Sequence, residues 1–380
     1  MWENKNMSNK NFFDNQSDGT AVKIKFYENY IEGYLTKILM QFGGCLVADL
    51  FCGPGKNGEK DGSPLILIKK AKKVLENPTL LVKQKLLKVF IVFNDCDKEN
   101  IEKLNIELSK TTLPSNIKIL KPQCSIFSDI ILDISEPKIT IPKFLFLDPF
   151  AYSNIQLSEI KKIMEMPFSE IMLFLPTFHA YRFKTSTKNT PKLISFLSNF
   201  TERGVYDYHN IYEFNNSIVN RIRKELNLKF VQHATIDVGK SKNALFLITK
   251  SIKGAMLFNN IFWKETYNGK ALKVSEIKYH EINPSLFPKS TILTTEHRNC
   301  INEFHKKMVV ELIKKKEMFN TDIIEFAVME GYKPKCANDM LVRLKKENKI
   351  KTEYINKIMT KGFYVSEDKY KQKLCKIIYL

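Results

Sequence analysis

The stretch "LVADLFCGPGKNG" runs from Leu46 to Gly58 and decides the fold. Its apolar start predicts a short buried strand, which breaks into a turn holding an acid, two closely spaced glycines and a proline. Gly53 and Gly55 allow positive φ angles and let the backbone approach a ligand with no Cβ in the way. The turn lacks the Lys-Ser/Thr ending of a P-loop, and the next helix begins only at Ser63. Ligands of an open parallel sheet bind beyond the carboxyl ends of the strands, so the stretch predicts a first strand with a nucleoside-binding turn.

Apolar runs and amphipathic helical patterns alternate along the chain around this turn. The runs show little polar alternation, which is typical of a parallel sheet covered by helices on both faces. We therefore predict a doubly wound α/β domain. Strands are expected at 45–51, 89–95, 117–120, 143–150 and 170–176, and helices at 23–42, 63–75, 98–108, 127–132 and 157–166. Two further runs, 229–238 and 243–250, predict a closing antiparallel pair.

The composition divides the chain into three parts. Residues 1–21 are polar and are expected to form an arm, and residues 22–290 form the α/β domain with a helical insertion at about 190–227. Residues 291–380 change to three helical patterns with a strand-like end, which is the outline of a winged helix. The helices are expected at 304–316, 320–329 and 335–348, and the wing at 349–355 and 361–367. A basic winged helix fits either nucleic acid or a protein partner.

Lysine and arginine number 60 against 41 aspartate and glutamate, which gives a formal charge of +19. Such a surplus attracts polyanions, so nucleic acid is the first partner to consider. The excess is mostly lysine in a sequence also crowded with Asn and Ile, and an AT-rich genome would impose the same bias. The candidate contacts with nucleic acid are Arg182, Lys184, Lys335, Arg343, Lys345 and Lys346.

The seven cysteines are scattered, without a Cys-x-x-Cys pair or a nearby histidine pattern, so no metal site is expected. Free thiols of this kind indicate a reducing compartment. No apolar run is long enough to cross a membrane, and the polar start lacks the hydrophobic core of a secretion signal. We therefore expect a cytoplasmic protein without a membrane segment.

Acidic side chains follow two more of the predicted strands. Asp95 ends the second strand, where a carboxylate binds the ribose hydroxyls of a nucleoside held over the first turn. Asp97 is expected to cap the helix that follows. Strand four runs into Asp148-Pro149-Phe150, and the proline fixes a turn that presents one carboxylate and one aromatic ring. The three turns should meet at one edge of the sheet.

These turns resemble motifs I, II and IV of class I S-adenosylmethionine-dependent methyltransferases. A closer resemblance is to the three-Cys-motif partner protein family (TcmP), which consists of bacterial proteins with a methyltransferase-like fold, often encoded beside a protein with a three-cysteine motif. It rests on "DLFCGPGKNGEKDGSPLILI", "LFLDPFA", "NALFLITKSIKGAMLFNNIFWK" and the winged-helix-like tail, and covers roughly residues 22–350. The resemblance implies a Rossmann-like methyltransferase sheet.

The resemblance also implies a cofactor and a reaction. S-adenosylmethionine would be held by Asp49, Phe51, Gly53, Gly55 and Asp95. The acceptor would be an exocyclic amine of a nucleic-acid base or nucleotide. Its hydrogens would be accepted by Asp148 and the Pro149 carbonyl, and its ring would stack on Phe150. Alignment and exclusion of water would then suffice for methyl transfer.

Two departures from the family pattern keep other interpretations open. Phe51 stands where many members have a glycine, and Cys124 or Ser125 stands near the place of the acid that usually follows strand three. The first alternative is therefore a catalytically degenerate subunit that binds nucleic acid or a partner, such as a three-Cys-motif protein, in a bacterial defence or modification system. The second is an NAD enzyme, since Gly53, Gly55 and Gly58 match the dinucleotide fingerprint, although its acid would have to come much earlier than Asp95.

Overall fold

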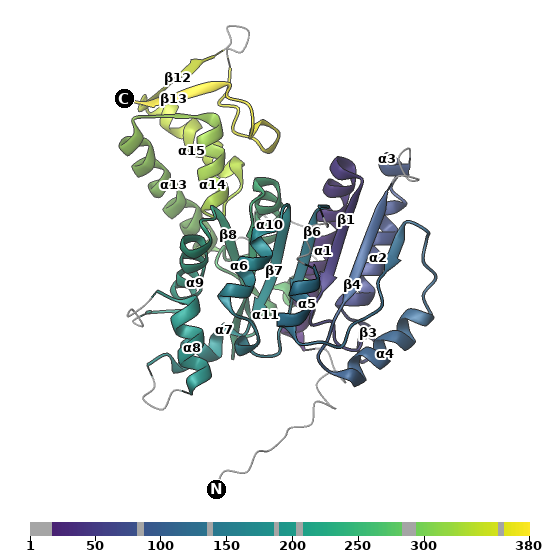
Figure 1. The fold of residues 1–380 in the computed structure, drawn as a ribbon. Helices are drawn as coiled ribbons and strands as arrows, with labels where there is room; N and C mark the ends of the chain where they lie inside the picture. Colours follow the sequence, from purple (N-terminus) through teal and green to yellow (C-terminus); the bar gives the residue numbers. More distant parts are fainter. Residues whose placement is uncertain are drawn as a thin grey trace.

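The computed structural model describes residues 17–81, 87–134, 140–185, 190–202, 208–282, 294–355 and 361–380. Residues 1–16, which make up most of the predicted arm, lie outside the described residues. The centre of the fold is an eight-stranded sheet with the strand order β10-β8-β9-β7-β6-β1-β4-β5 (Figure 1). Its strands are β1 Gly44–Asp49, β4 Lys88–Phe93, β5 Ile117–Ile119, β6 Lys143–Leu147, β7 Ser169–Leu175, β8 Phe230–Asp237, β9 Lys242–Thr249 and β10 Ala271–Lys273.

The sheet is doubly wound. The chain runs from β1 outward to β4 and β5, and then returns to β6 on the other side of β1, so the strand order reverses at β1. All pairs are parallel except those of β9, which is antiparallel to both β7 and β8. All five residues of β6 are buried, as expected for a central strand with both faces covered. The predicted Rossmann-like α/β fold and the predicted antiparallel pair are confirmed.

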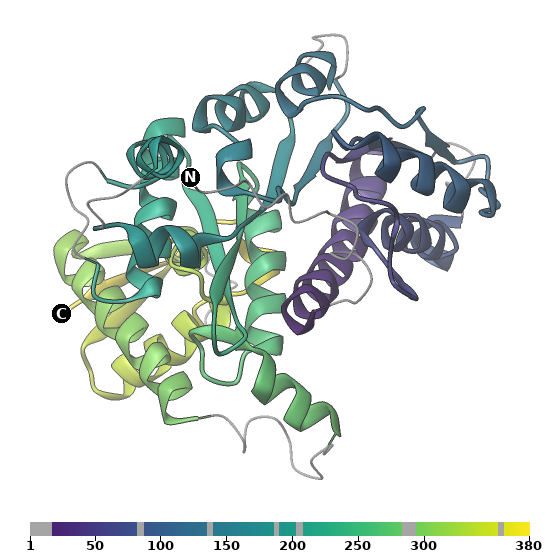
Figure 2. The ribbon, with the colours of Figure 1, turned by 90° about the horizontal axis from the view of Figure 1, so that it is seen from below.

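Two apolar clusters cover the two faces of the sheet (Figure 2). The helices of the first cluster are α1 Asp18–Phe42, α2 Ser63–Leu75, α4 Lys98–Ser109, α10 Ile252–Glu265 and α11 Val274–Ile282. The helices of the second are α5 Phe127–Ile134, α6 Leu157–Glu165, α7 Thr177–Phe183, α8 Pro191–Phe200 and α9 Ile211–Leu226. Within the range 190–227, where a helical insertion is predicted, the structure has α8 and α9, which pack into the second cluster, and residues 203–207 lie outside the described residues.

Helix α1 is longer than its apolar pattern predicts. It begins at Asp18, with the Ser17 side chain accepting a hydrogen bond from the Thr20 N–H, and so includes the last residues that were assigned to the arm. It ends at Gly43, whose φ of 75° lies in the left-handed region that favours glycine. The buried ring of Tyr27 packs 4.3 Å from that of Phe146, which fixes α1 across the centre of the sheet.

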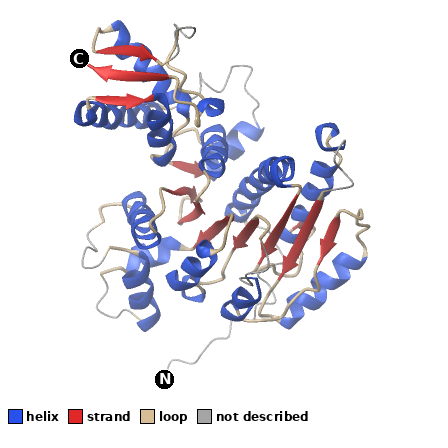
Figure 3. Ribbon diagram, turned by 45° about the horizontal axis from the view of Figure 1, so that its top comes forward, coloured by secondary structure: helices blue, strands red, loops and turns tan. Residues whose placement is uncertain are grey.

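In the described residues from 294 onward, α-helices pack beside a three-stranded sheet (Figure 3). The elements of this C-terminal part are α13 Thr295–Lys315, β11 Glu317–Phe319, α14 Asn320–Met329, α15 Pro334–Lys346, β12 Ile350–Tyr354 and β13 Cys375–Tyr379. The predicted first wing strand corresponds to β12. The predicted second strand at 361–367 is wrong, because β12 pairs instead with β13, and β11 adds a third strand to the other edge of β13. The winged-helix assignment stays a prediction.

Side chains of the sheet domain hold the backbone at the end of α14 and in the turn after it. The Trp263 Nε1–H donates to the Gly331 carbonyl at 2.7 Å, and the Asn259 amide donates to the Val328 carbonyl at 3.1 Å. The Arg223 guanidinium donates to the Met329 carbonyl. These bonds fix the C-terminal part against α9 and α10. Among the described residues, no helix combines the length and the apolar character needed to span a membrane.

Candidate functional site

A cavity of about 450 Å³ lies beyond the carboxyl ends of the parallel strands. Its walls include Gly53 and Gly55 from the turn after β1, Asp95 after β4, and the segment 148–150 after β6. The start of α1 and the turn between β8 and β9 close the remaining sides. The structure therefore brings together the three turns that the sequence analysis singled out, at the point where the strand order reverses.

The glycine turn needs glycine at both positions. Gly53 has φ 63° and Gly55 has φ 85°, angles that other residues adopt only with strain. A Cβ on Gly55 would lie 2.9 Å from the Leu104 Cδ1 atom, so the backbone passes close to α4. The sequence did not predict the small hairpin within this turn, formed by β2 Lys56–Asn57 and β3 Lys60–Asp61. Gly58 belongs to that hairpin region and does not line the cavity, and α2 begins only at Ser63, which disfavours the dinucleotide alternative.

Asp49 ends β1 and is fully buried behind the cavity wall. Neither of its carboxylate oxygens has a hydrogen-bonding partner among the described residues. Burial raises the pKa of the Asp49 carboxyl to about 7, and the nearby charges of Asp148 and Asp95 act in the same direction. The Ser63 hydroxyl and the Phe51 N–H lie near the carboxyl without forming a regular hydrogen bond to it, and they offset this effect only in part. The first strand thus ends in a carboxyl group that lacks a counter-charge.

Asp95 joins the second turn to the first. Its Oδ2 accepts a hydrogen bond from the Gly53 N–H at 2.9 Å, and its Oδ1 accepts from the Asp97 N–H at 2.9 Å and from the Asn100 amide at 3.2 Å. A carboxylate has about four lone-pair sites, so acceptor capacity remains on the cavity side. Asp97 accepts from the Glu99 N–H at 2.9 Å, and its predicted role as the cap of α4 is confirmed.

Asp148 is paired with a lysine that the sequence analysis missed. The Lys23 ammonium of α1 donates to the Asp148 Oδ2, and it also lies 4.4 Å from the centre of the Phe174 ring. The Lys23 side chain is 9% exposed and that of Asp148 is 22% exposed, so the ion pair is largely shielded from water. The two residues are 125 positions apart, and no local pattern signals the contact. The expected amine-binding carboxylate thus already holds one ammonium group.

The aromatic residues of the predicted site lie in different surroundings. The Phe150 ring is 68% exposed at the rim of the cavity, next to Pro149, as expected for a ring that stacks on an incoming group. Phe51 lines the cavity and also packs 5.3 Å from the Phe127 ring in the second cluster. Of the described residues in the segment 120–126, which directly follows β5, none lines the cavity, and that side is formed by Cys96, Asp97 and Asn100.

The six basic residues proposed for nucleic acid do not line this cavity. Arg182 and Lys184 follow β7 on or just after α7, where each cation lies over a ring, 5.5 Å from Phe183 and 4.1 Å from Tyr181 respectively. Four residues on α15 are exposed at the C-terminal part: Lys335, Arg343, Lys345 and Lys346. His179 packs 4.8 Å from the Phe183 ring and is also absent from the cavity wall, which favours a packing role.

No protein-family model matches the chain, and no curated protein matches its sequence. The three-Cys-motif partner family therefore stays a prediction. Solved structures similar to the chain include the plantazolicin methyltransferase BpumL in complex with SAH, with a TM-score of 0.33 and 11% identity over 65% of this chain and 92% of that one. A putative O-methyltransferase from Klebsiella pneumoniae has a TM-score of 0.32 and 6% identity over 58% of this chain and 80% of that one. The METTL16 methyltransferase domain has a TM-score of 0.30 and 11% identity over 59% of this chain and 81% of that one. Likenesses this weak add no argument about a substrate.

Proposed function

We propose that the chain is an S-adenosylmethionine-dependent methyltransferase that acts on a nucleic-acid base or nucleotide, with an exocyclic amine as the favoured acceptor. One observation carries the proposal: the glycine turn, Asp95 and the Asp-Pro-Phe turn line a single cavity at the switch point of the sheet. Ligands of doubly wound sheets bind at this position. The cavity is also large enough for a nucleoside.

The residues present fit this cofactor. The positive φ angles at Gly53 and Gly55 leave bare backbone where a ligand can approach closely. Asp95, with about one of its four lone-pair sites left, would accept a hydrogen bond from a ribose hydroxyl, and the side formed by Cys96 and Asn100 would face the adenine. The buried charge of Asp49 would attract the cationic methionine end of the cofactor, which would supply an activated methyl group on its sulfonium.

The chain's own groups would orient the acceptor. The Asp148 carboxylate and the Pro149 carbonyl would accept hydrogen bonds from the amine, which aligns the nitrogen lone pair, and the exposed Phe150 ring would stack on the base. Since Lys23 occupies the Asp148 Oδ2, the amine would use the other oxygen or displace the ammonium. The walls provided by α1 would help exclude water.

The Lys23–Asp148 ion pair also favours the alternative, a degenerate subunit that binds nucleic acid or a protein partner. If Lys23 stays on Asp148 Oδ2, the carboxylate is already neutralised and only its other oxygen can accept from an amine. Calorimetry with S-adenosylmethionine separates the two possibilities from the start. A functional cofactor site should bind the compound, and Asp95→Ala should abolish binding, whereas Asp129→Ala on α5, an exposed aspartate away from the cavity, should not.

Activity is tested by mass spectrometry of total nucleosides from cells with and without the protein. We expect a methylated nucleoside that disappears with Asp148→Asn, a change that keeps the shape of the side chain. Cofactor binding without any such nucleoside would refute a nucleic-acid acceptor. Absence of cofactor binding would refute the methyltransferase and leave the binding subunit, whose partner would then be sought among three-Cys-motif proteins.

A further inference from the structure

Two further cavities continue from the candidate site toward the C-terminal part. The first, which we call the hairpin cavity, has a volume of about 410 Å³ and is lined by Phe178, Tyr181, Asn210, Tyr212, Lys242 and Lys270, among others. The second, the junction cavity, has a volume of about 700 Å³ and lies between α9, α10 and the segment 329–332, where α14 ends. Asn210, Tyr212 and Lys270 line both, so the two cavities adjoin.

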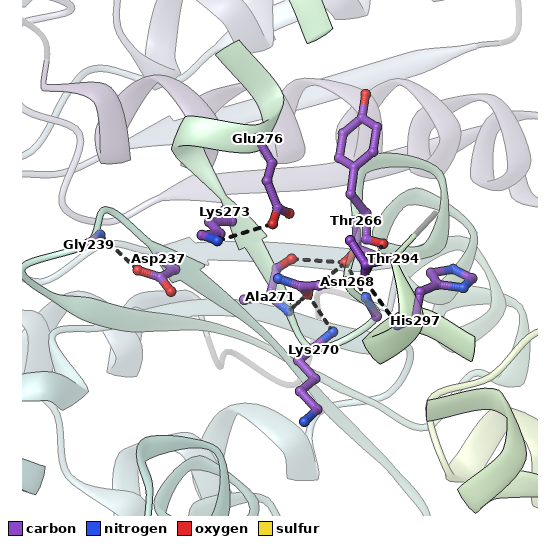
Figure 4. A network of polar contacts seen from close by, with 12 residues as sticks. Asp237, Gly239, Thr266, Asn268, Lys270, Ala271, Lys273, Glu276, Thr294 and His297 are labelled. Carbon is purple, nitrogen blue, oxygen red and sulfur yellow. Dashed lines mark hydrogen bonds and ion pairs between the residues drawn. The ribbon is translucent and has the colours of Figure 1, made fainter. Parts of the chain in front are cut away.

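The turn between β8 and β9 separates the hairpin cavity from the candidate site. Side chains alternate between the two faces of a strand, and here Ile236 and Val238 face the candidate site while Asp237 faces the hairpin cavity. The turn itself is exposed at Val238, Gly239 and Lys240. Asp237 supports the turn by accepting a hydrogen bond from the Gly239 N–H at 2.8 Å (Figure 4). A chain leaving the candidate site can therefore cross an exposed turn into the hairpin cavity.

The hairpin cavity combines aromatic rings with charges that cancel. Lys242 pairs with Asp237 at 3.7 Å, and Lys273 pairs with Glu276 at 3.2 Å. Lys270 is exposed and forms no ion pair with another described residue. In Figure 4 its side chain extends away from the loop that carries it. Because its charges cancel, the hairpin cavity does not attract phosphate groups strongly. Its rings can instead stack on uncharged aromatic groups.

Tyr212 is the ring that both cavities share. Burial raises the pKa of its phenol, and the charges of Asp237 and Glu276, which line the hairpin cavity with it, act in the same direction. The loop opposite is held by Asn268, whose Oδ1 accepts from the Lys270 N–H at 2.8 Å and from the Ala271 N–H at 2.9 Å. Tyr212, at the start of α9, and this fixed loop thus line the same cavity.

The junction cavity offers side-chain amides beside aromatic rings. Asn216 and Asn220 are exposed on α9. Tyr332 lines the cavity with a partly exposed ring, whereas the Trp263 ring is buried and packs 5.0 Å from that of Tyr332. Its Lys307 is neutralised by Glu330 at 2.8 Å. Unstacked bases are recognised by stacking on aromatic rings and by hydrogen bonds from amides, whereas the phosphates are attracted by the overall charge of +19.

We propose that the hairpin and junction cavities bind the unpaired bases of a single-stranded nucleic acid, next to the nucleotide held in the candidate site. The strand crosses the turn 238–240 and runs toward the C-terminal part. This inference rests on the proposed function for the identity of the acceptor, but its binding test needs no cofactor. RNA and DNA share the chemistry used here and are tested separately.

The test is fluorescence anisotropy with labelled RNA and DNA strands of about 12 nucleotides and mixed sequence, measured without S-adenosylmethionine. Tyr212→Leu removes the shared ring and Lys270→Glu reverses the exposed charge. Each should weaken binding about fivefold or more. The matched control is Lys118→Glu on β5, an exposed lysine at the opposite edge of the sheet, which should change binding less than about twofold. Cofactor binding should stay unchanged in all three variants, since none of the residues lines the candidate site.

The inference is overturned if all three variants bind the strand equally well. It is also overturned if an acidic peptide displaces the labelled strand as effectively as an unlabelled strand does. Ultraviolet crosslinking gives an independent measurement, and the crosslinked peptides should contain Tyr181 or Tyr212. Crosslinks confined to α15 overturn the path. If the strand binds in these two cavities and S-adenosylmethionine does not bind, the proposed strand-binding site is supported and the methyltransferase proposal fails. If the cofactor binds and no strand does, the path fails and the cofactor site stands.

Discussion

Asp49→Asn should make the ligand-free protein more stable at neutral pH. The Asp49 carboxyl is fully buried, its oxygens have no hydrogen-bonding partner among the described residues, and burial raises its pKa from 3.8 to about 7. At low pH the group is protonated in both the folded and the unfolded protein, and its ionisation costs nothing. As the pH rises from about 4 to about 7, the unfolded chain releases this proton and the folded protein retains it, so the free energy of unfolding falls.

The loss in the free energy of unfolding follows from the shift in the Asp49 pKa. Roughly three pH units at about 1.4 kcal/mol each amount to about 4 kcal/mol lost between pH 4 and pH 7. Asparagine cannot ionise, so Asp49→Asn should match the wild type near pH 4 and exceed its free energy of unfolding by up to about 4 kcal/mol above pH 7. Urea unfolding followed by circular dichroism over this pH range measures the difference. Asp133→Asn, an exposed carboxyl on α5, serves as the control.

A difference between the wild type and Asp49→Asn that does not change with pH would refute this reasoning. The cofactor gives a second measurement on the same pair of proteins. S-adenosylmethionine carries a cationic methionine end, so it should bind the wild type more tightly as the pH rises through about 7 and Asp49 ionises. The affinity of Asp49→Asn should show no such rise.

Three further predictions concern the cavity and the C-terminal part. Lys23→Met should lower the free energy of unfolding by about 1–3 kcal/mol, because it leaves the largely shielded Asp148 carboxylate unpaired, whereas Lys23→Arg should retain most of it in thermal melts. Gly55→Ala should cost about 1–3 kcal/mol and weaken cofactor binding by calorimetry, since its φ is 85° and its Cβ would meet Leu104. Asn320→Ala should cost about 3 kcal/mol or more and raise hydrogen exchange throughout 317–379, because the buried amide makes four hydrogen bonds to backbone groups.

The convergence of the three turns could be predicted because strand register in a parallel sheet is set by the apolar runs. Asp49 pairs in register with Phe93 of β4 and with Phe146 of β6. Asp95 and Asp148 each follow two residues after these partners, so both must emerge beside the end of β1. An apolar run that ends in a polar turn marks locally where a strand ends. These strand ends and the helical patterns between them were enough to predict the fold class.

The contacts that could not be predicted join distant parts of the chain. Lys23 lies on the face of α1 among apolar residues, and nothing in its neighbourhood distinguishes it from a lysine at the edge of a helix. The partner of β12 was misassigned for a similar reason, since 361–367 is closer in sequence and also holds the aromatic and β-branched residues typical of a strand. In the structure the Cys375 N–H and the Leu374 N–H both lie against the buried Asn320 side chain, which favours β13 as the paired strand. Such a polar anchor is visible only once the fold is known.

The charges of the molecule are arranged in a way that would separate its two proposed ligands. The whole chain carries +19, yet the charged residues lining the candidate site are one lysine and three aspartates, with the buried Asp49 behind them. An anionic strand is therefore attracted to the outer surface and repelled from the cavity floor, where a cationic sulfonium is favoured. A base must then enter the cavity without its phosphates, which would stay outside, where Lys240 is exposed on the turn between β8 and β9. This requirement favours a flexible single strand over a rigid duplex as the acceptor.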